Sequence, residues 1–205
     1  MSRRGWFPQA SRPQGHPLAS RSNLVANAKG TVMVGLVKAL RREKARAREL
    51  VSPELAHYLD ERIVMAAWYP LEDFIALLRL CERVVPTASA RGCEERGRLA
   101  AREHMAGAYS RLSQTTHRRA TFSLLASMFD SGQMSVVERR PGGAVLDFSG
   151  FALPAREVCE IFTGYNAERM TLLGFEEVRV RHTQCRVDGA PTCRWELAWK
   201  GRESL

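Results

Sequence analysis

The sequence contains no apolar run long enough to cross a bilayer. The best candidate, TVMVGLVKAL from Thr31 to Leu40, has about ten residues and includes Lys38, whereas a membrane-spanning helix needs about 20 apolar residues. A secretory leader is also missing, because Arg3 and Arg4 are followed by Pro, Gln and Ser rather than by an apolar segment. We therefore expect a cytoplasmic protein without a membrane partner.

Residue patterns that carry enzymatic chemistry are missing as well. Ser110, Ser123 and Ser127 fall within expected helices and lack the strand–turn–helix elbow of a hydrolase nucleophile. No glycine-rich loop precedes a helix in the way that phosphate binding requires. His104 and His117 have no nucleophile at a useful spacing, and we expect both to be exposed. The sequence therefore predicts no enzyme.

The cysteines do not form the even set that a disulfide framework requires. There are five of them, Cys81, Cys93, Cys159, Cys185 and Cys193, in a chain without an export signal. An odd number in such a chain argues against structural disulfides.

Positive charge is concentrated near the N-terminus. The formal net charge is +9, and eleven of the 31 Lys and Arg residues but one of the 22 acidic residues lie before residue 49. We interpret residues 1–28, which are rich in Ser, Pro, Gly and Arg, as a disordered basic arm. Such an arm attracts anionic partners loosely, so nucleic-acid binding is not expected beyond weak contacts of the arm.

Residues 29–205 are expected to form a single α+β domain with a helical part (31–130) and a mixed part (131–200). Apolar residues recur at helical spacing in the first part, and Ser52 with Pro53 marks a helix start. We expect helices to begin at Thr31 and at Pro53. A third helix should follow the aromatic turn Trp68-Tyr69-Pro70 within the segment that ends at Val85, and two more are expected near residues 94–113 and 118–130.

The spacing of apolar residues changes after residue 130. Two strands joined by a Pro-Gly-Gly turn are followed by a helix over residues 154–173 and by a second hairpin around DGAP. This order predicts a helical layer packed on a four-stranded antiparallel sheet.

The second hairpin carries two cysteines. A turn centred on Gly189 places Cys185 opposite Cys193, and it also pairs Thr183 with Trp195 and Arg181 with Leu197. Directly opposed Cβ atoms lie about 4.5–5.5 Å apart, beyond the usual disulfide separation of about 3.8 Å, so a disulfide would be strained. The two residues are either small buried side chains or part of a metal site, because sulfurs at this distance can share a zinc ion.

Two further residues complete a set of zinc ligands. Cys159 lies on the helix that precedes the hairpin, and His182 lies three residues before Cys185. Because a regular strand points residues 182 and 185 to opposite faces, His182 can join the site only through a bulge or a bend. The predicted ligands are Cys159, His182, Cys185 and Cys193, and four protein ligands would make the zinc structural.

The segment from Cys159 to Trp199 resembles the C-terminal half of the 4-vinyl-reductase-type small-molecule-binding domain, which is related to the haem–nitric-oxide-binding fold and to TRAPP vesicle-tethering subunits. The resemblance implies zinc ligation by its three cysteines, with His182 at the position of the family's acidic ligand. From about Gly30 onward the chain is also similar to a myxobacterial paralogous family of uncharacterised proteins, through KGTVMVGLVKALRRE, WYPLEDFIALLR and VRHTQCRVDGAPTCRWELAW. Because that family is uncharacterised, the similarity implies no particular activity for this chain.

Aromatic residues either fill the core or line a pocket for a small apolar ligand, where the resembling domains place theirs. These residues are Trp68, Tyr69, Phe122, Phe129, Phe162, Tyr165 and Trp195. The sequence thus favours a non-catalytic sensory or regulatory module that binds a small apolar ligand and a structural zinc. The alternative is a scaffold or assembly subunit that forms a homodimer through its helices, which requires an exposed apolar patch on the first two helices.

Overall fold

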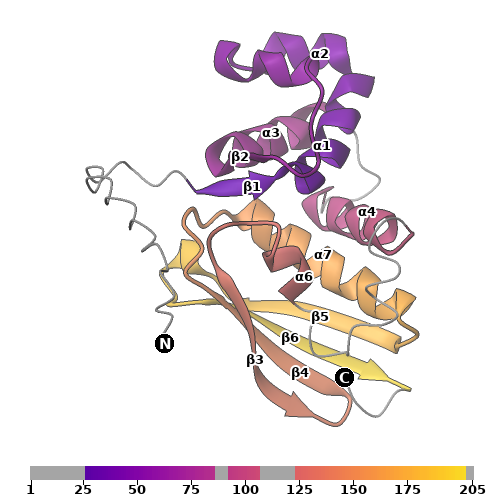
Figure 1. Cartoon of the computed structure of the whole chain (residues 1–205). Coiled ribbons are helices and arrows are strands. Elements are labelled where there is room, and N and C mark those ends of the chain that lie inside the picture. Colours follow the sequence, from indigo (N-terminus) through magenta and orange to yellow (C-terminus); the bar gives the residue numbers. More distant parts are fainter. Residues whose placement is uncertain (1–25, 86–91, 107–122, 202–205) are drawn as a thin grey trace, which may run out of the picture.

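A computed structural model of the chain describes residues 26–85, 92–106 and 123–201 (Figure 1). Most of the expected basic arm lies outside these residues, but its last residues are ordered, because strand β1 begins at Asn27. In chain order the described elements are β1 (Asn27–Lys29), α1 (Gly30–Arg42), α2 (Lys44–Leu50), η1 (Pro53–Leu59), β2 (Trp68–Pro70), α3 (Leu71–Val84), α4 (Gly92–Ala106), α6 (Ser123–Ala126), β3 (Gln133–Arg140), β4 (Gly143–Ser149), α7 (Arg156–Leu172), β5 (Glu176–Gln184), η2 (Arg186–Asp188) and β6 (Cys193–Lys200). The α+β class is confirmed.

Helices α1 and α3 bury the faces that their apolar spacing predicts. The buried residues include Met33, Leu36, Val37 and Leu40 of α1 and Leu71, Phe74, Ile75, Leu78 and Cys81 of α3. The helix expected after Ser52 is the 3-10 helix η1, and the Ser52 side chain accepts no capping hydrogen bond. The helices expected over 94–113 and 118–130 are represented by α4 and α6, and residues 107–122 lie outside the described part of the chain.

The pairing of β1 with β2 was not predicted. Each strand has three residues, too few for a periodic signal, and they pair antiparallel with Lys29 opposite Trp68. Gly30 follows β1 at a close approach of two chain segments, because a Cβ there would lie 2.0 Å from the carbonyl oxygen of Val64. This contact holds the start of α1 against the loop that precedes β2.

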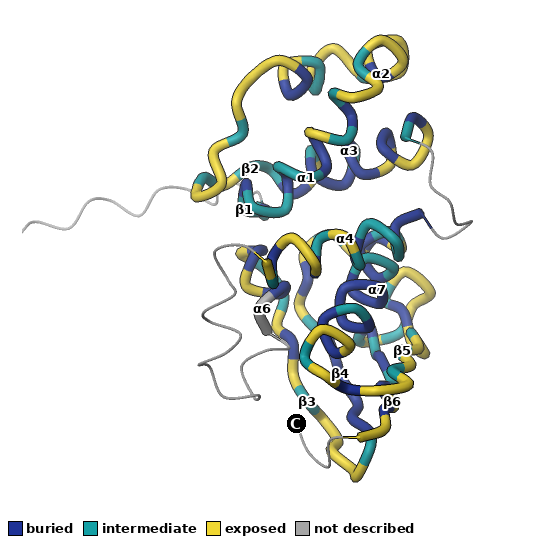
Figure 2. Tube along the Cα trace, turned by 90° about the vertical axis from the view of Figure 1, so that its right-hand side faces the viewer, coloured by how far each residue is buried: buried dark blue, intermediate teal, exposed yellow. Residues whose placement is uncertain are grey.

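Helices α4 and α7 pack backbone against backbone. A Cβ on Gly97 would lie 2.2 Å from the Ile161 carbonyl oxygen, and a Cβ on Gly164 would lie 1.8 Å from that of Glu94. Figure 2 shows α7 largely buried, with α4 on one side of it and the strands on the other. Helix α7 is therefore the central element between the helical layer and the sheet.

The sheet has the strand order β3-β4-β6-β5, and each neighbouring pair is antiparallel. Strand β6 alternates, with Cys193, Trp195, Leu197 and Trp199 buried. The helix expected over 154–173 is α7, which buries Val158, Phe162 and Tyr165. Leu172, at helical spacing from Tyr165, is exposed because it lies in the last turn of α7. In the described parts of the chain no helix has the length and apolar character needed to span a membrane.

Candidate functional site

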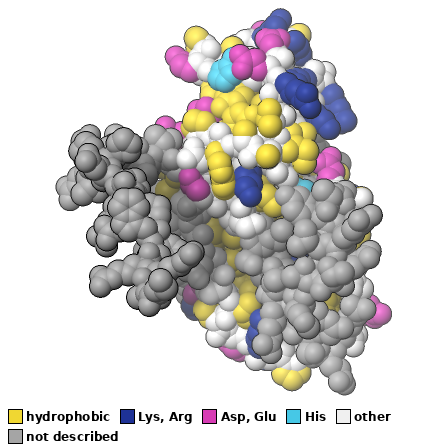
Figure 3. All heavy atoms as spheres, in the orientation of Figure 1, with side chains coloured by type: hydrophobic (Ala, Val, Ile, Leu, Met, Phe, Trp, Pro, Cys, Tyr) yellow, Lys and Arg dark blue, Asp and Glu magenta, His cyan; other side chains and the backbone are white. Residues whose placement is uncertain are grey.

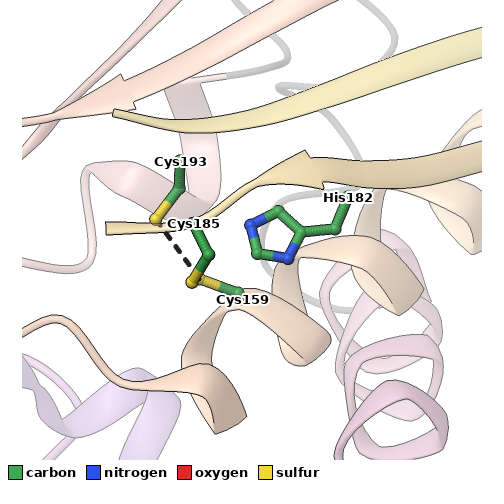
Figure 4. Close-up of side chains that lie close together, drawn as sticks. All are labelled: Cys159, His182, Cys185 and Cys193. Atoms are coloured by element: carbon green, nitrogen blue, oxygen red, sulfur yellow. Dashed lines mark hydrogen bonds between the residues drawn. The ribbon is translucent and has the colours of Figure 1, made fainter. Parts of the chain in front are cut away.

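The four predicted metal ligands lie together at the junction of α7 and the second hairpin (Figure 4). Cys159 comes from the first turns of α7, His182 from β5, and Cys185 and Cys193 from either side of the loop that joins β5 to β6. The three cysteines are buried and His182 is half-buried. The packing of α7 on the sheet thus joins residues that are far apart in the sequence.

The spacing of the ligand atoms is that of a tetrahedral metal site. The Sγ atom of Cys159 lies 3.5 Å from that of Cys193 and 4.0 Å from that of Cys185. All four ligand atoms lie within 4.8 Å of one another. Zinc with Zn–S bonds of about 2.3 Å holds its sulfurs about 3.8 Å apart. The cluster therefore needs little rearrangement to receive such an ion.

A bulge in β5 brings His182 into the cluster. The register between β5 and β6 shifts between His182 and Gln184, so that Thr183 is the extra residue. As a result His182 lies opposite Trp195, on the buried face of β6 that also carries Cys193. The condition set by the sequence, a bulge near His182, is met.

The same bulge makes the predicted strand pairing wrong. Trp195 faces His182 and not Thr183, because the extra residue moves the register by one position. For the same reason Arg181 lies opposite Glu196 and not Leu197.

Hydrogen bonds within the cluster shift the pKa values of two of its thiols in opposite directions. A hydrogen bond from the Cys159 thiol lowers the pKa of Cys193, while burial opposes this and His182 assists it. The same hydrogen bond, together with burial, raises the pKa of Cys159 well above its usual range. The Arg186 backbone N–H also donates to the Cys193 sulfur at 3.4 Å. These contacts favour the thiolate form of Cys193, the form of cysteine that binds metal ions.

The His182 ring is held in place mainly by packing on Trp195. It stacks on Trp195 with the ring centres 4.8 Å apart, and the Trp195 indole N–H donates to Thr163 Oγ1 at 2.9 Å. The His182 Nε2 atom is buried and has no hydrogen-bond partner among the described residues. A buried nitrogen without a partner costs free energy, which a metal bond would remove.

A second feature is a cavity of about 170 Å³ between α1 and α3 on one side and α4 on the other. Its apolar lining consists of Val32, Leu36, Ala39, Phe74, Leu78, Leu99, Ala100, Leu125, Phe129 and Ile161. Charged side chains, among them Lys38 and Arg42, also border it. The cavity therefore suits a small, mainly apolar molecule.

His104 lines this cavity and is buried, which corrects the expectation that it is exposed. Its Nδ1 atom lies 3.2 Å from the hydroxyl oxygen of Tyr165 on α7, and burial lowers its pKa. The helical spacing contains a signal for this burial, because His104 lies three residues after Ala101, an apolar residue on the same face of the helix. The second histidine expected to be exposed, His117, lies outside the described residues.

The aromatic residues expected to line one pocket do not converge. Phe129 lines the cavity, whereas Phe162, Tyr165 and Trp195 are almost fully buried in the core. Trp68 is 47% exposed, Tyr69 is half-buried, and the position of Phe122 is not described. Most of the described members fill the core or lie at the surface because the cavity is built from α1, α3 and α4, where aliphatic residues predominate.

Helix α7 belongs to both features. Ile161 lines the cavity, and Cys159, two residues earlier, belongs to the Cys/His cluster. A movement of the first turns of α7 would therefore change the geometry of both the cavity and the Cys/His cluster.

No protein-family model matches the sequence, and no curated protein matches it. The narrower resemblances, to 4-vinyl-reductase-type domains and to a myxobacterial family, therefore receive no support. The broader expectation of a haem–nitric-oxide-binding fold can be tested against solved structures.

Several solved H-NOX proteins have a similar structure. An Fe(II) unliganded H-NOX mutant from K. algicida is 8% identical, covers 85% of this chain and 97% of its own, and gives a TM-score of 0.58. An Fe(II) H-NOX mutant from S. oneidensis is 14% identical, covers 86% and 98%, and gives 0.54. A structure from work on haem distortion in the H-NOX family is 12% identical, covers 86% and 97%, and gives 0.61. At these identities the likeness concerns the fold alone, and this chain has the H-NOX fold.

Proposed function

We propose that the protein is a non-catalytic sensory or regulatory module that binds a small apolar molecule in the cavity between α1, α3 and α4. The observation that carries the proposal is the cavity itself, which is mainly apolar and shares the wall residue Ile161 with α7. The H-NOX fold supports the same proposal, because a solved relative is described as an oxygen-binding domain related to soluble guanylate cyclases.

Haem is the first ligand to compare with this cavity, since one similar structure concerns haem distortion. Pockets that bury drug-sized ligands have volumes of about 300–1,000 Å³, and a porphyrin is larger than such ligands. The cavity that the described residues line has about 170 Å³. This space is smaller than such pockets, so we propose a ligand smaller than haem. A cavity of about 150 Å³ can hold benzene or xenon, so the proposed ligand is of that size.

The Cys/His cluster would hold a structural zinc ion. Its three sulfurs and one imidazole are ligand types of structural zinc sites, and four protein ligands leave no open position for a catalytic water. The ion would fasten the first turns of α7 to the loop between β5 and β6. The protein would then respond to its ligand through α7, because the same turns contribute Ile161 to the cavity.

The alternative function, a scaffold that dimerises through its helices, has less support. It requires an exposed apolar patch on the first helices. Among the described large hydrophobic side chains of α1, α2 and η1, Leu50 alone is exposed. One side chain does not make a patch.

Titration of the full chain with benzene, followed by protein NMR, tests the cavity. We expect saturable shifts of cavity residues in the wild type and their loss in Ala100→Phe, because the added ring occupies the cavity. Ala45→Phe, at an exposed position of α2, is the matched control and should bind benzene normally. Equal binding by both variants, no binding by the wild type, or stoichiometric haem uptake would each contradict the proposal.

A further inference from the structure

The loop between η1 and β2 exposes an uninterrupted apolar sequence. Residues 63–68 read Ile-Val-Met-Ala-Ala-Trp, and the side chains of Val64, Met65 and Trp68 are 52%, 52% and 47% exposed. Figure 3 shows hydrophobic side chains gathered on the upper part of one face, with Lys and Arg side chains beside them. Surface loops are normally polar, and a run of exposed apolar residues is costly unless it has a role.

The backbone of this loop is held in place, so the exposure is built into the fold. The Met65 carbonyl oxygen accepts hydrogen bonds from the backbone N–H and the hydroxyl of Thr31. The Ala67 carbonyl oxygen accepts from the Gly30 N–H, and the Val64 N–H donates to the Tyr69 hydroxyl. These bonds use the inward groups of the loop and leave its apolar side chains outside.

Two cationic side chains lie beside the apolar residues of the loop. The Lys29 ammonium lies 5.2 Å from the centre of the Trp68 ring, and Arg62 directly precedes the apolar run and is exposed. The acidic neighbours are Glu61, which is exposed, and Asp60, whose carboxylate is paired with Lys44 and Arg48.

The sequence before β1 is also basic. Residues 1–25 contain four arginines and no acidic residue. Residues 1–25 lie outside the part of the chain that the structure describes, so the charge beside the loop is that of Lys29 and Arg62.

We propose that the loop from Arg62 to Trp68 docks the domain onto an anionic lipid surface. Val64, Met65 and Trp68 would enter the interfacial layer, where tryptophan is favoured, while Lys29 and Arg62 would lie among anionic headgroups. Lying on a surface needs no spanning helix. A protein partner is less well matched, because stable protein interfaces use about 20–30 residues a side, far more than this loop supplies. The proposal is independent of the cavity and of the metal cluster.

Co-sedimentation of the full chain with vesicles tests the proposal. We expect binding to phosphatidylcholine vesicles that contain phosphatidylserine, and little binding to phosphatidylcholine alone. The double variant Met65→Ser/Trp68→Ser should lose most of this binding. The matched control is Val137→Ser, at an equally exposed apolar position on β3, and it should bind as the wild type does.

Charge is tested separately by changing Lys29 and Arg62 to Gln in the full chain. Each basic residue near an anionic membrane contributes about 1 kcal/mol, so each change should weaken binding by up to about fivefold. The melting temperature of every variant verifies its folding. Failure of the wild type to bind, or undiminished binding by Met65→Ser/Trp68→Ser, would overturn the proposal. Self-association that this double variant abolishes, without vesicle binding, would assign the loop to a second copy of the chain and would also overturn it.

Discussion

Replacing Gly164 by Ala tests whether α7 packs as closely on α4 as the structure shows. The new Cβ would lie 1.8 Å from the carbonyl oxygen of Glu94, and the obstacle is backbone, which cannot rotate away. The two helices must therefore move apart by more than 1 Å, since real Cβ contacts below 3.0 Å essentially do not occur. This movement would loosen α7 between the cavity and the sheet.

Two opposing contributions set the magnitude for Gly164→Ala. Alanine is favoured over glycine inside a helix by about 0.5–1 kcal/mol. Overpacking a tight contact costs about 1–3 kcal/mol and sometimes more. Because the obstacle is backbone, the upper end of that range applies, and we expect a net loss of about 2 kcal/mol. For a chain of this size that corresponds to a fall in melting temperature of about 4–8 °C.

Thermal and urea unfolding, followed by circular dichroism, measure this effect. Gly35→Ala in α1 is the matched control, because its nearest neighbour is the flexible end of Glu103 at 3.4 Å. That control should leave stability unchanged or raise it by up to about 1 kcal/mol. If Gly164→Ala also stabilises the protein, the close contact between α4 and α7 is refuted.

Two other substitutions probe buried polar contacts. Burial lowers the pKa of His104, so the folded state binds its proton less readily than the unfolded state, whose pKa is about 6.5. The wild type should lose stability as the pH falls below about 6.5, and His104→Gln should reduce this loss in urea titrations at several pH values; an unchanged pH slope would contradict the buried position. Thr163→Val removes the acceptor of the Trp195 indole N–H and should cost about 1–3 kcal/mol in urea unfolding, whereas Thr171→Val near the end of α7 should have little effect. Equal losses for the two threonine variants would show that the indole bond is unimportant.

The helical layer was largely predictable because its signal is local. In α1 and α3, four or five apolar residues at helical spacing repeat the pattern that a buried helix face requires, and these residues are buried. Strands of three residues contain no such repeat, which is why β1 and β2 were missed. Their pairing depends on Gly30 and Val64, residues that meet only in the folded chain.

The residues of the Cys/His cluster could be predicted from the sequence, but the geometry of the cluster could not. Cys159, Cys185 and Cys193 were recognisable by residue type and by the hairpin between the last two. The bulge at Thr183 has no signature in the sequence, because it depends on how β5 pairs with β6. It shifts the β6 partner of the residues of β5 that precede Thr183. The cavity was missed for a related reason. It is bordered by α1, α3, α4 and α7, and only their packing shows which apolar side chains leave space between them.

Metal analysis of the purified chain tests the central claim, that the Cys/His cluster holds a structural zinc ion. We expect about one zinc per chain in the wild type, since a tetrahedral site binds a single ion. Cys185→Ser should lose the zinc and unfold at a lower temperature, because metal binding contributes directly to folding stability. Cys81→Ser, which changes a buried cysteine outside the cluster, should keep it. A wild type that contains no zinc and takes up none after reduction, or a Cys185→Ser variant that retains it, would contradict the account.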